Sequence, residues 1–123
     1  MNPLTREWLA KAEEDRNIAV SLFRRKKIPA NTICFHAQQA AEKYIKAVLQ
    51  ERRTPFARTH DLLALVELMG AEAGTLPLMA DDFLHLSGYA VISRYPGFNA
   101  TTRDAKTAVA AMKRVRAVAV SLI

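Results

Sequence analysis

The sequence predicts an all-α fold, a helical bundle that forms one domain over residues 1–123. Half of the residues are hydrophobic, and a chain of this length can bury a core without disulfides or a metal ion. Apolar residues recur at helical spacing over long segments, and the 4 glycines and 5 prolines fall between those segments. No repeat, low-complexity tract or interdomain linker interrupts this pattern.

Composition sets limits on the partners of the chain. The formal net charge is +6, from 18 Lys and Arg against 12 Asp and Glu, which permits an anionic partner such as RNA or a nucleotide without requiring one. A single cysteine, Cys34, excludes an internal disulfide and a cysteine-based zinc cluster. No apolar run approaches the roughly 20 residues of a membrane span, and the N-terminus lacks the apolar stretch of a signal peptide. We therefore expect a soluble, cytoplasmic protein without a membrane partner.

The first helix is predicted from about Pro3 to Lys26, with Pro3 in its first turn. Asp15 lies within the apolar arc of this helix, where an unpaired carboxylate is costly to bury, so it needs a basic or donor partner. The basic cluster at residues 24–27 closes the helix. Its cations complement the carbonyl end of the helix dipole, and a phosphate-binding patch is the alternative interpretation.

The second helix is predicted from a cap at Asn31 or Thr32 to about Arg53, because Pro55 disfavours helix in the residue before it. Helical spacing places small and apolar side chains on one face and polar side chains on the other. The predicted core face includes Ala37, Ala40, Ala41 and Tyr44, and the polar face includes His36, Gln39, Lys43, Lys46 and Gln50. Such a polar face is a solvated surface, a site for an anionic group, or a contact with a second subunit.

A short third helix is predicted to follow the loop at residues 58–61, with Thr59 as its cap and Asp61 in its first turn. Its apolar face is formed by Leu62 and three later residues at helical spacing, Leu65, Val66 and Met69. His60 beside Asp61 is compatible with acid–base chemistry, but a histidine in a first turn more often supports its loop.

A fourth helix is predicted from Pro77 to about Tyr95, with Phe83 on its apolar face. Arg94 points into the same sector, so its guanidinium must reach a carboxylate or close over a cleft. Because Asp15 and Arg94 are each an awkward charge on an apolar face, we predict that they form a charge pair. Tyr89 and Ile92 project the other way, as a subunit interface would require.

The last helix is predicted to begin at a cap formed by Thr101 and Asp104 after the stop at Pro96-Gly97. Its predicted core face is Ala105, Ala108, Val109, Met112, Val115 and Ala119.

Common catalytic motifs are absent: the chain has no Gly-rich phosphate loop, no His-Glu-x-x-His sequence and no recognisable Ser/His/Asp set. The histidines His36, His60 and His85 fall on three different predicted helices. We therefore predict no metal site and no cofactor.

Four segments in this order and at this spacing resemble the HEPN family, the higher eukaryotes and prokaryotes nucleotide-binding domain. They are Ala12-Glu13-Glu14-Asp15, Phe35-His36-Ala37-Gln38-Gln39-Ala40-Ala41-Glu42-Lys43, Thr59-His60-Asp61-Leu62 and Ser93-Arg94-Tyr95-Pro96. The resemblance spans nearly the whole chain. It implies an up-and-down bundle of four to five helices, usually a homodimer, often paired with a minimal nucleotidyltransferase as toxin and antitoxin.

Many members of that family are metal-independent ribonucleases that use an arginine and a later histidine with four to six residues between them, at a cleft between two subunits. Arg94 matches the arginine by position, but Asn99 and its neighbours stand where the histidine is required. Arg53 and His60 have the required spacing, but they bracket Pro55 in a loop, so we interpret that match as chance. His36 or His60 would have to take the place of the missing base.

The resemblance therefore favours a binding module for a nucleotide, an RNA or a nucleotidyltransferase protein. Its predicted binding residues are His36, Gln39, Lys43, Arg94 and Tyr95. A ribonuclease is the first alternative, with Arg94, His60 and His36 as catalytic candidates, and a structural dimer subunit is the second.

Overall fold

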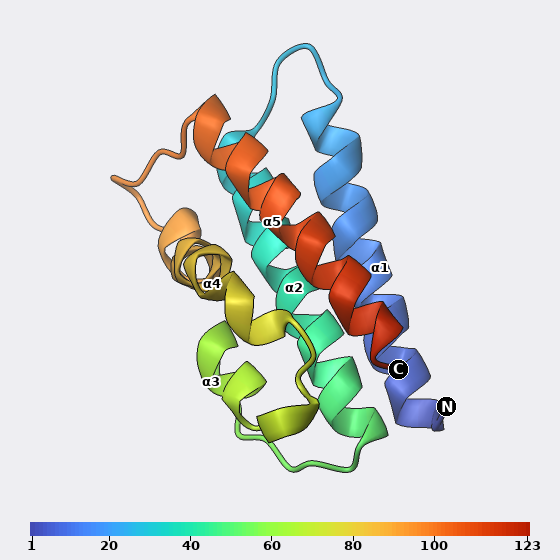
Figure 1. Ribbon diagram of the computed structural model, residues 1–123. Helices are drawn as coiled ribbons and strands as arrows, with labels where there is room; N and C mark the ends of the chain where they lie inside the picture. Colours follow the sequence, from blue (N-terminus) through green and yellow to red (C-terminus); the bar gives the residue numbers. More distant parts are fainter.

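Five α-helices and four short 3-10 turns make up the computed structural model, which describes all of residues 1–123. The long helices α1, α2 and α5 run alongside one another, and the short α3 and α4 cover one side of them (Figure 1). The α-helices are α1 (Pro3–Phe23), α2 (Ala30–Glu51), α3 (Leu62–Glu67), α4 (Ala80–Ser87) and α5 (Thr102–Ser121). The 3-10 turns are η1 (Gly70–Glu72), η2 (Leu76–Met79), η3 (Gly88–Ala90) and η4 (Ile92–Arg94). The predicted all-α fold is confirmed.

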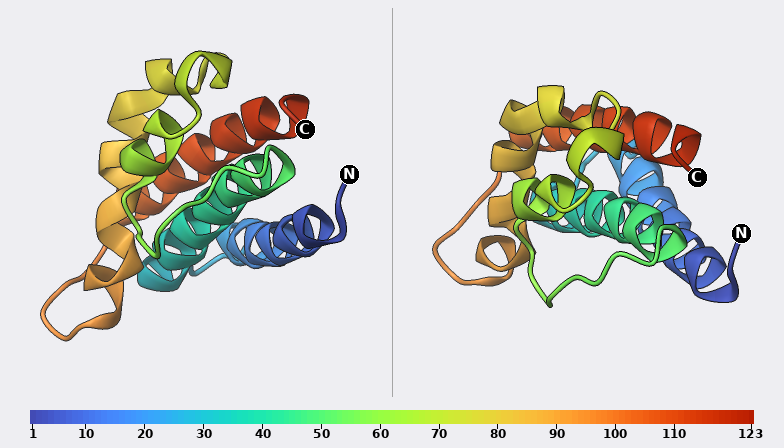
Figure 2. Two further views of the ribbon diagram at one scale, coloured as in Figure 1. Left: turned by 90° about the horizontal axis from the view of Figure 1, so that it is seen from below. Right: turned by 60° about the horizontal axis from the view of Figure 1, so that its bottom comes forward.

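Helix α2 is the central element, with α1, α5 and the α3–α4 region around it (Figure 2). Its predicted core face is confirmed, since Ala37, Ala40, Ala41 and Tyr44 are fully buried. The small alanines let the backbones of neighbouring helices approach closely. The buried Tyr44 hydroxyl needs a partner, and it donates to a carboxylate oxygen of Glu13 at 2.7 Å.

The start of α5 follows the sequence prediction. The Thr101 hydroxyl accepts from the Asp104 backbone N–H at 3.0 Å, and an Asp104 carboxylate oxygen accepts from the Thr101 N–H at 2.9 Å. These reciprocal bonds form a capping box that satisfies two otherwise unpaired donors at the helix end.

The predicted cap of α2 is wrong. Pro29 occupies the capping position without a side-chain bond, and the Asn31 amide instead bonds the segment before α5. Its Nδ2 donates to the Phe98 carbonyl at 3.2 Å, and its Oδ1 accepts from the Ala100 N–H at 2.6 Å. Asn31 therefore ties the chain before α5 to the start of α2.

The caps and ends of the other helices are shifted by two or three residues. Asp61, and not Thr59, caps α3 by accepting from the Ala64 N–H at 3.2 Å. Helix α1 ends at Phe23, so the basic cluster 24–27 lies in the loop after it, and α2 ends at Glu51.

The predicted fourth helix is broken. Only α4 is α-helical, and residues 88–90 and 92–94 form the 3-10 turns η3 and η4. Gly88 is a poor helix former, and the Val91 backbone, at φ −120° and ψ −53°, interrupts the helix between the two turns. The Ser93 hydroxyl donates to the Tyr89 carbonyl at 2.6 Å inside this segment. Ile92 is exposed, so the predicted second buried side contains only Tyr89.

Candidate functional site

The predicted charge pair between Asp15 and Arg94 is not formed. One carboxylate oxygen of Asp15 accepts a hydrogen bond from His36 Nδ1 at 2.8 Å, and the other accepts one from Lys43 Nζ. Both partners lie on α2. Arg94 makes no salt bridge, and its guanidinium lies over the Phe35 ring, 5.1 Å from the centroid. Helix α2 separates the two charges, because α1 packs against one of its sides and η4 packs against another.

The predicted binding residues consequently fall into separate groups. His36 and Lys43 face α1 and are engaged by Asp15, whereas Arg94 and Tyr95 lie beyond the other side of α2. Gln39 sits between the groups, and its Nε2 donates to the side-chain Oε1 of Gln38 at 2.7 Å. The polar face of α2 is therefore divided between an internal ion pair and a second, more extensive network.

Glu42 is the centre of that network, and sequence analysis did not identify it. Its side chain is almost fully buried, at 4% exposure, and its two oxygens accept three hydrogen bonds. The donors are Gln38 Nε2 at 2.9 Å, His60 Nδ1 at 2.6 Å and Lys46 Nζ at 2.9 Å. Polar residues 38, 42 and 46 recur every four positions, which is a signal for one stripe along a helix. Their position beneath the 52–61 loop, however, depends on the tertiary fold.

Lys46 is buried as well, at 7% exposure, although the sequence predicted it on the polar face. Its ammonium group lies 5.5 Å from the Trp8 ring centroid and 5.8 Å from that of Phe56, in addition to its bond to Glu42. The aromatic faces and the carboxylate together compensate for the loss of water around the cation.

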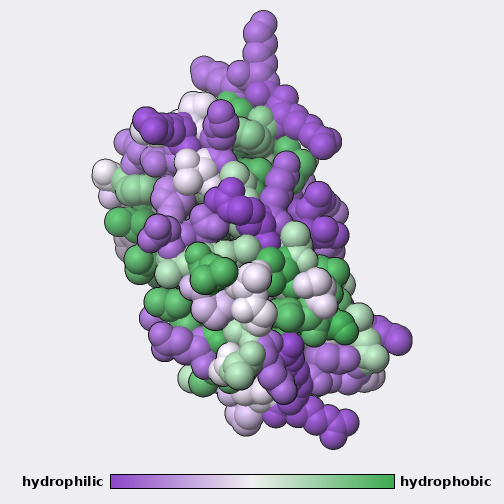
Figure 3. Space-filling model, in the orientation of Figure 1, coloured by the Kyte–Doolittle hydropathy of each residue, from purple (hydrophilic) through white to green (hydrophobic).

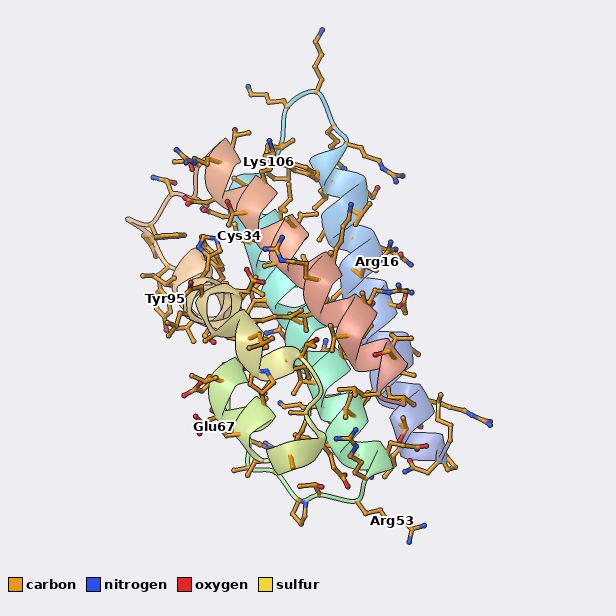
Figure 4. All side chains as sticks on the ribbon, viewed as in Figure 1. Arg16, Cys34, Arg53, Glu67, Tyr95 and Lys106 are labelled. Carbon is orange, nitrogen blue, oxygen red and sulfur yellow. The ribbon has the colours of Figure 1, made fainter.

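An open pocket of about 360 Å³ lies where the loop before α3 meets η3 and η4. It is lined by His60, Ala90, Val91, Arg94 and Tyr95. Tyr95 projects from this side of the molecule in Figure 4. A larger hollow on the outer face of α1 has a mostly apolar lining that includes Leu4 and Trp8, so it lacks this chemistry.

The contacts of His60 determine which of its ring nitrogens is free. A carboxylate can only accept, so the bond to Glu42 requires the hydrogen on Nδ1 and leaves Nε2 unpaired. The imidazole is 53% exposed. The pocket therefore combines an oriented ring nitrogen with the guanidinium of Arg94, which has no acidic partner. Guanidinium groups bind the oxygens of phosphate and carboxylate groups well, so the arrangement is suited to an anionic ligand.

Glu42 should make the stability of the fold depend on pH in the acid range. Burial raises the pKa of Glu42, but bonds from His60, Lys46 and Gln38 outweigh burial and hold the pKa below its usual value of 4.5. A lowered carboxyl pKa gives stability that is complete above the unfolded value and is lost as pH falls through the folded value. We expect the free energy of unfolding to fall as the pH drops below about 5, and to fall less in Glu42→Gln.

Urea unfolding at several pH values measures this effect. Glu67→Gln is the matched control, because Glu67 is exposed on α3. If Glu42→Gln and Glu67→Gln followed the same pH profile as the unmodified protein, the assignment to Glu42 would be wrong.

No group of three His, Cys, Asp or Glu side chains is placed to hold a metal ion. None of the helices has both the length and the apolar character needed to cross a bilayer.

Comparisons with known proteins point to one family. The sequence model described as HEPN domain matches residues 5–122. Two similar solved structures are TT1696 from Thermus thermophilus, with a TM-score of 0.83, and ST0689, described as an archaeal HEPN homologue, with a TM-score of 0.73. Each is 23% identical to this chain, and each comparison covers 97% of this chain and 98% of the other. No curated protein matches the sequence.

Proposed function

This chain belongs to the HEPN domain family, and from that premise we propose that it is a binding module for a phosphate group of a nucleotide or RNA. The proposal depends on one observation: the unpaired guanidinium of Arg94 and the free Nε2 of His60 line the same open pocket. Tyr95, 63% exposed at the pocket edge, offers an aromatic face on which a base can stack.

The proposed site differs from the predicted binding set. His60 joins Arg94 and Tyr95 as a ligand-contacting residue, while His36 and Lys43 hold Asp15 and support the helix that carries the network. Gln39, which bonds Gln38 beside Glu42, is assigned to the same supporting shell.

Calorimetric titration with a nucleoside monophosphate tests the proposal. Arg94→Ala should weaken binding by about tenfold or more, because hydrogen bonds to charged groups contribute on the order of 1.5–3 kcal/mol. His60→Ala should also weaken it. Arg6→Ala is the matched control, since Arg6 is an exposed cation on α1 outside the pocket. Equal affinities in Arg94→Ala and Arg6→Ala would exclude the pocket as the site.

RNA cleavage is a second candidate function, supported by the hydrogen bond between Glu42 and His60. An orienting carboxylate leaves His60 Nε2 free to accept the proton of a ribose 2′-hydroxyl, and Arg94 can hold the phosphate. His60 would thus act in place of the histidine that is missing after Arg94. The test is incubation of purified protein with RNA in the presence of EDTA. Cleavage by the unmodified protein, and not by His60→Ala or Arg94→Ala, supports the enzyme; absence of cleavage leaves binding alone.

Self-association and a protein partner form the last part of the proposal. Four large apolar side chains are exposed on one short segment, namely Leu84, Val91, Ile92 and Tyr95. A second copy of this chain packed there would cover them and narrow the adjacent pocket. A monomer mass by light scattering at micromolar concentration would reject the homodimer. Copurification with a nucleotidyltransferase encoded beside this gene would support a toxin–antitoxin pair. A dimer that binds neither a ligand nor a partner protein would instead be a structural subunit.

A further inference from the structure

Six cationic side chains gather at the end of the bundle where the loop after α1 lies beside the start of α5. They are Arg24, Arg25, Lys26 and Lys27 in the loop and Arg103 and Lys106 in α5, and we call this set the basic end. All six side chains are exposed, and none forms a salt bridge. Figure 3 shows a hydrophilic surface at this end, and Figure 4 shows Lys106 near the loop.

The two segments are held together by the Asn31 hydrogen bonds to Phe98 and Ala100. A hollow of about 410 Å³ lies between them, lined by residues 28–32 with Asn99, Ala100 and Thr102. The loop cations at residues 24–27 directly precede one wall of this hollow, and Arg103 directly follows Thr102 in the other.

Negative charge is nearly absent from the basic end. Asp104 is the one acidic residue in segments 24–32 and 98–106, and its carboxylate is occupied by the capping box. Most of the formal net charge of +6 is consequently concentrated at this end of the molecule.

The helix dipole accounts for only part of this concentration. The loop cations follow the C-terminus of α1, where positive charge is favourable. Arg103 and Lys106 instead lie in the first turns of α5, where the partial positive charge of the helix end disfavours cations. The position of these two cations is therefore electrostatically unfavourable in the free protein. A bound ligand of negative charge would make it favourable.

A groove of about 650 Å³ continues from the basic end along the exposed face of α5. Arg103, Lys106 and Arg114 line it together with the hydroxyl side chains Thr102 and Thr107. Arg114 is already paired with Asp82, at 2.8 and 3.0 Å, so the free cations are those at the basic end of the groove.

We propose that the basic end binds the phosphate backbone of a single-stranded RNA, without reading its sequence. This inference extends the proposed function, because a strand that contacts both the pocket and the basic end identifies the ligand as a polymer and not a mononucleotide. An anionic membrane is a poorer match, since no large apolar side chain is exposed in segments 24–32 or 98–106 for insertion. Unpaired cations in and beside a groove, as Arg103 and Lys106 are here, are typical of backbone recognition.

The experiment is fluorescence anisotropy with a fluorescein-labelled RNA of mixed sequence, about 20 nucleotides long, titrated from about 50 to 200 mM NaCl. Two double variants, Lys26→Gln with Lys27→Gln and Arg103→Gln with Lys106→Gln, each remove two charges from the basic end. Each should weaken binding several-fold and reduce the slope of log affinity against log salt by roughly 1.4, about 0.7 for each lost phosphate contact.

The matched control is Arg6→Gln with Lys11→Gln, which removes the same charge from exposed residues of α1 outside the basic end. It should leave the salt slope unchanged. Equal slopes in the control and in both basic-end variants would overturn the inference, as would the absence of RNA binding by the unmodified protein at 50 mM NaCl. Binding to phosphatidylserine vesicles without binding to RNA would also overturn it.

Titration of the same variants with a nucleoside monophosphate separates this inference from the proposed function. The basic-end variants should bind the mononucleotide as the unmodified protein does, whereas Arg94→Ala should not. If the basic-end variants retain their affinity for both the mononucleotide and the RNA, the assignment of RNA binding to the basic end is wrong and the assignment of the pocket stands. If RNA binding depends on the basic end but no mononucleotide binds, the assignment of the basic end stands and the assignment of the pocket is wrong.

Discussion

Replacing Glu42 with alanine is expected to lower the free energy of unfolding by about 3–5 kcal/mol, the usual range for breaking a buried ion pair from one side. The variant leaves the Lys46 ammonium buried without its carboxylate. It also removes the acceptor that serves both Gln38 and His60. Lys46 and Gln38 are buried, so water cannot readily replace the partner that they lose. His60 is half exposed and can bond to water instead. Urea unfolding followed by circular dichroism at neutral pH measures the loss.

Two further variants test whether the loss comes from the stranded charge. Glu42→Leu combined with Lys46→Met replaces both ions with apolar groups of similar volume, so it should be more stable than Glu42→Leu alone. Glu13→Ala removes another carboxylate with two partners, Tyr44 and Arg116, but this one is partly exposed, so we expect a smaller effect. A cost below about 1 kcal/mol for Glu42→Ala would contradict the assigned role of the buried pair.

The network around Glu42 illustrates which features of this site the sequence predicts and which it does not. Helical spacing correctly assigned the alanines and Tyr44 of α2 to the core, since that inference needs only the geometry of one helix. The capping box at Thr101 is also a local feature, and the sequence predicts it correctly. The contact between His60 and Glu42 spans 18 residues and depends on where a loop returns to the bundle, so no local pattern contains it.

The error over Asp15 has a related cause. The sequence correctly indicates that this carboxylate needs a partner, but spacing within α1 and within residues 77–95 does not tell which element faces which. In the fold, α2 lies between them, and its own His36 and Lys43 side chains reach Asp15. Arg94 is thereby left free, which turns a predicted structural charge into the main feature of the pocket.

Helix α4 provides the second large expected effect. Eight residues are too few to make a stable helix by intrinsic propensity, so α4 depends on the side chains that it buries. Phe83 is the largest of these and is fully buried in the core. Phe83→Ala should lower the free energy of unfolding by about 3–5 kcal/mol, through lost burial and the cavity that remains.

Leu84→Ala is the matched control on the adjacent position. Leu84 is 70% exposed, so its truncation should change stability by no more than about 0.5 kcal/mol. Because α4 leads directly into η3 and η4, Phe83→Ala should also speed amide hydrogen exchange in residues 88–95 more than in α1. Uniform acceleration throughout the chain would show instead that the Arg94 segment opens only with the whole bundle. In that case, the pocket would be as rigid as the core that supports it.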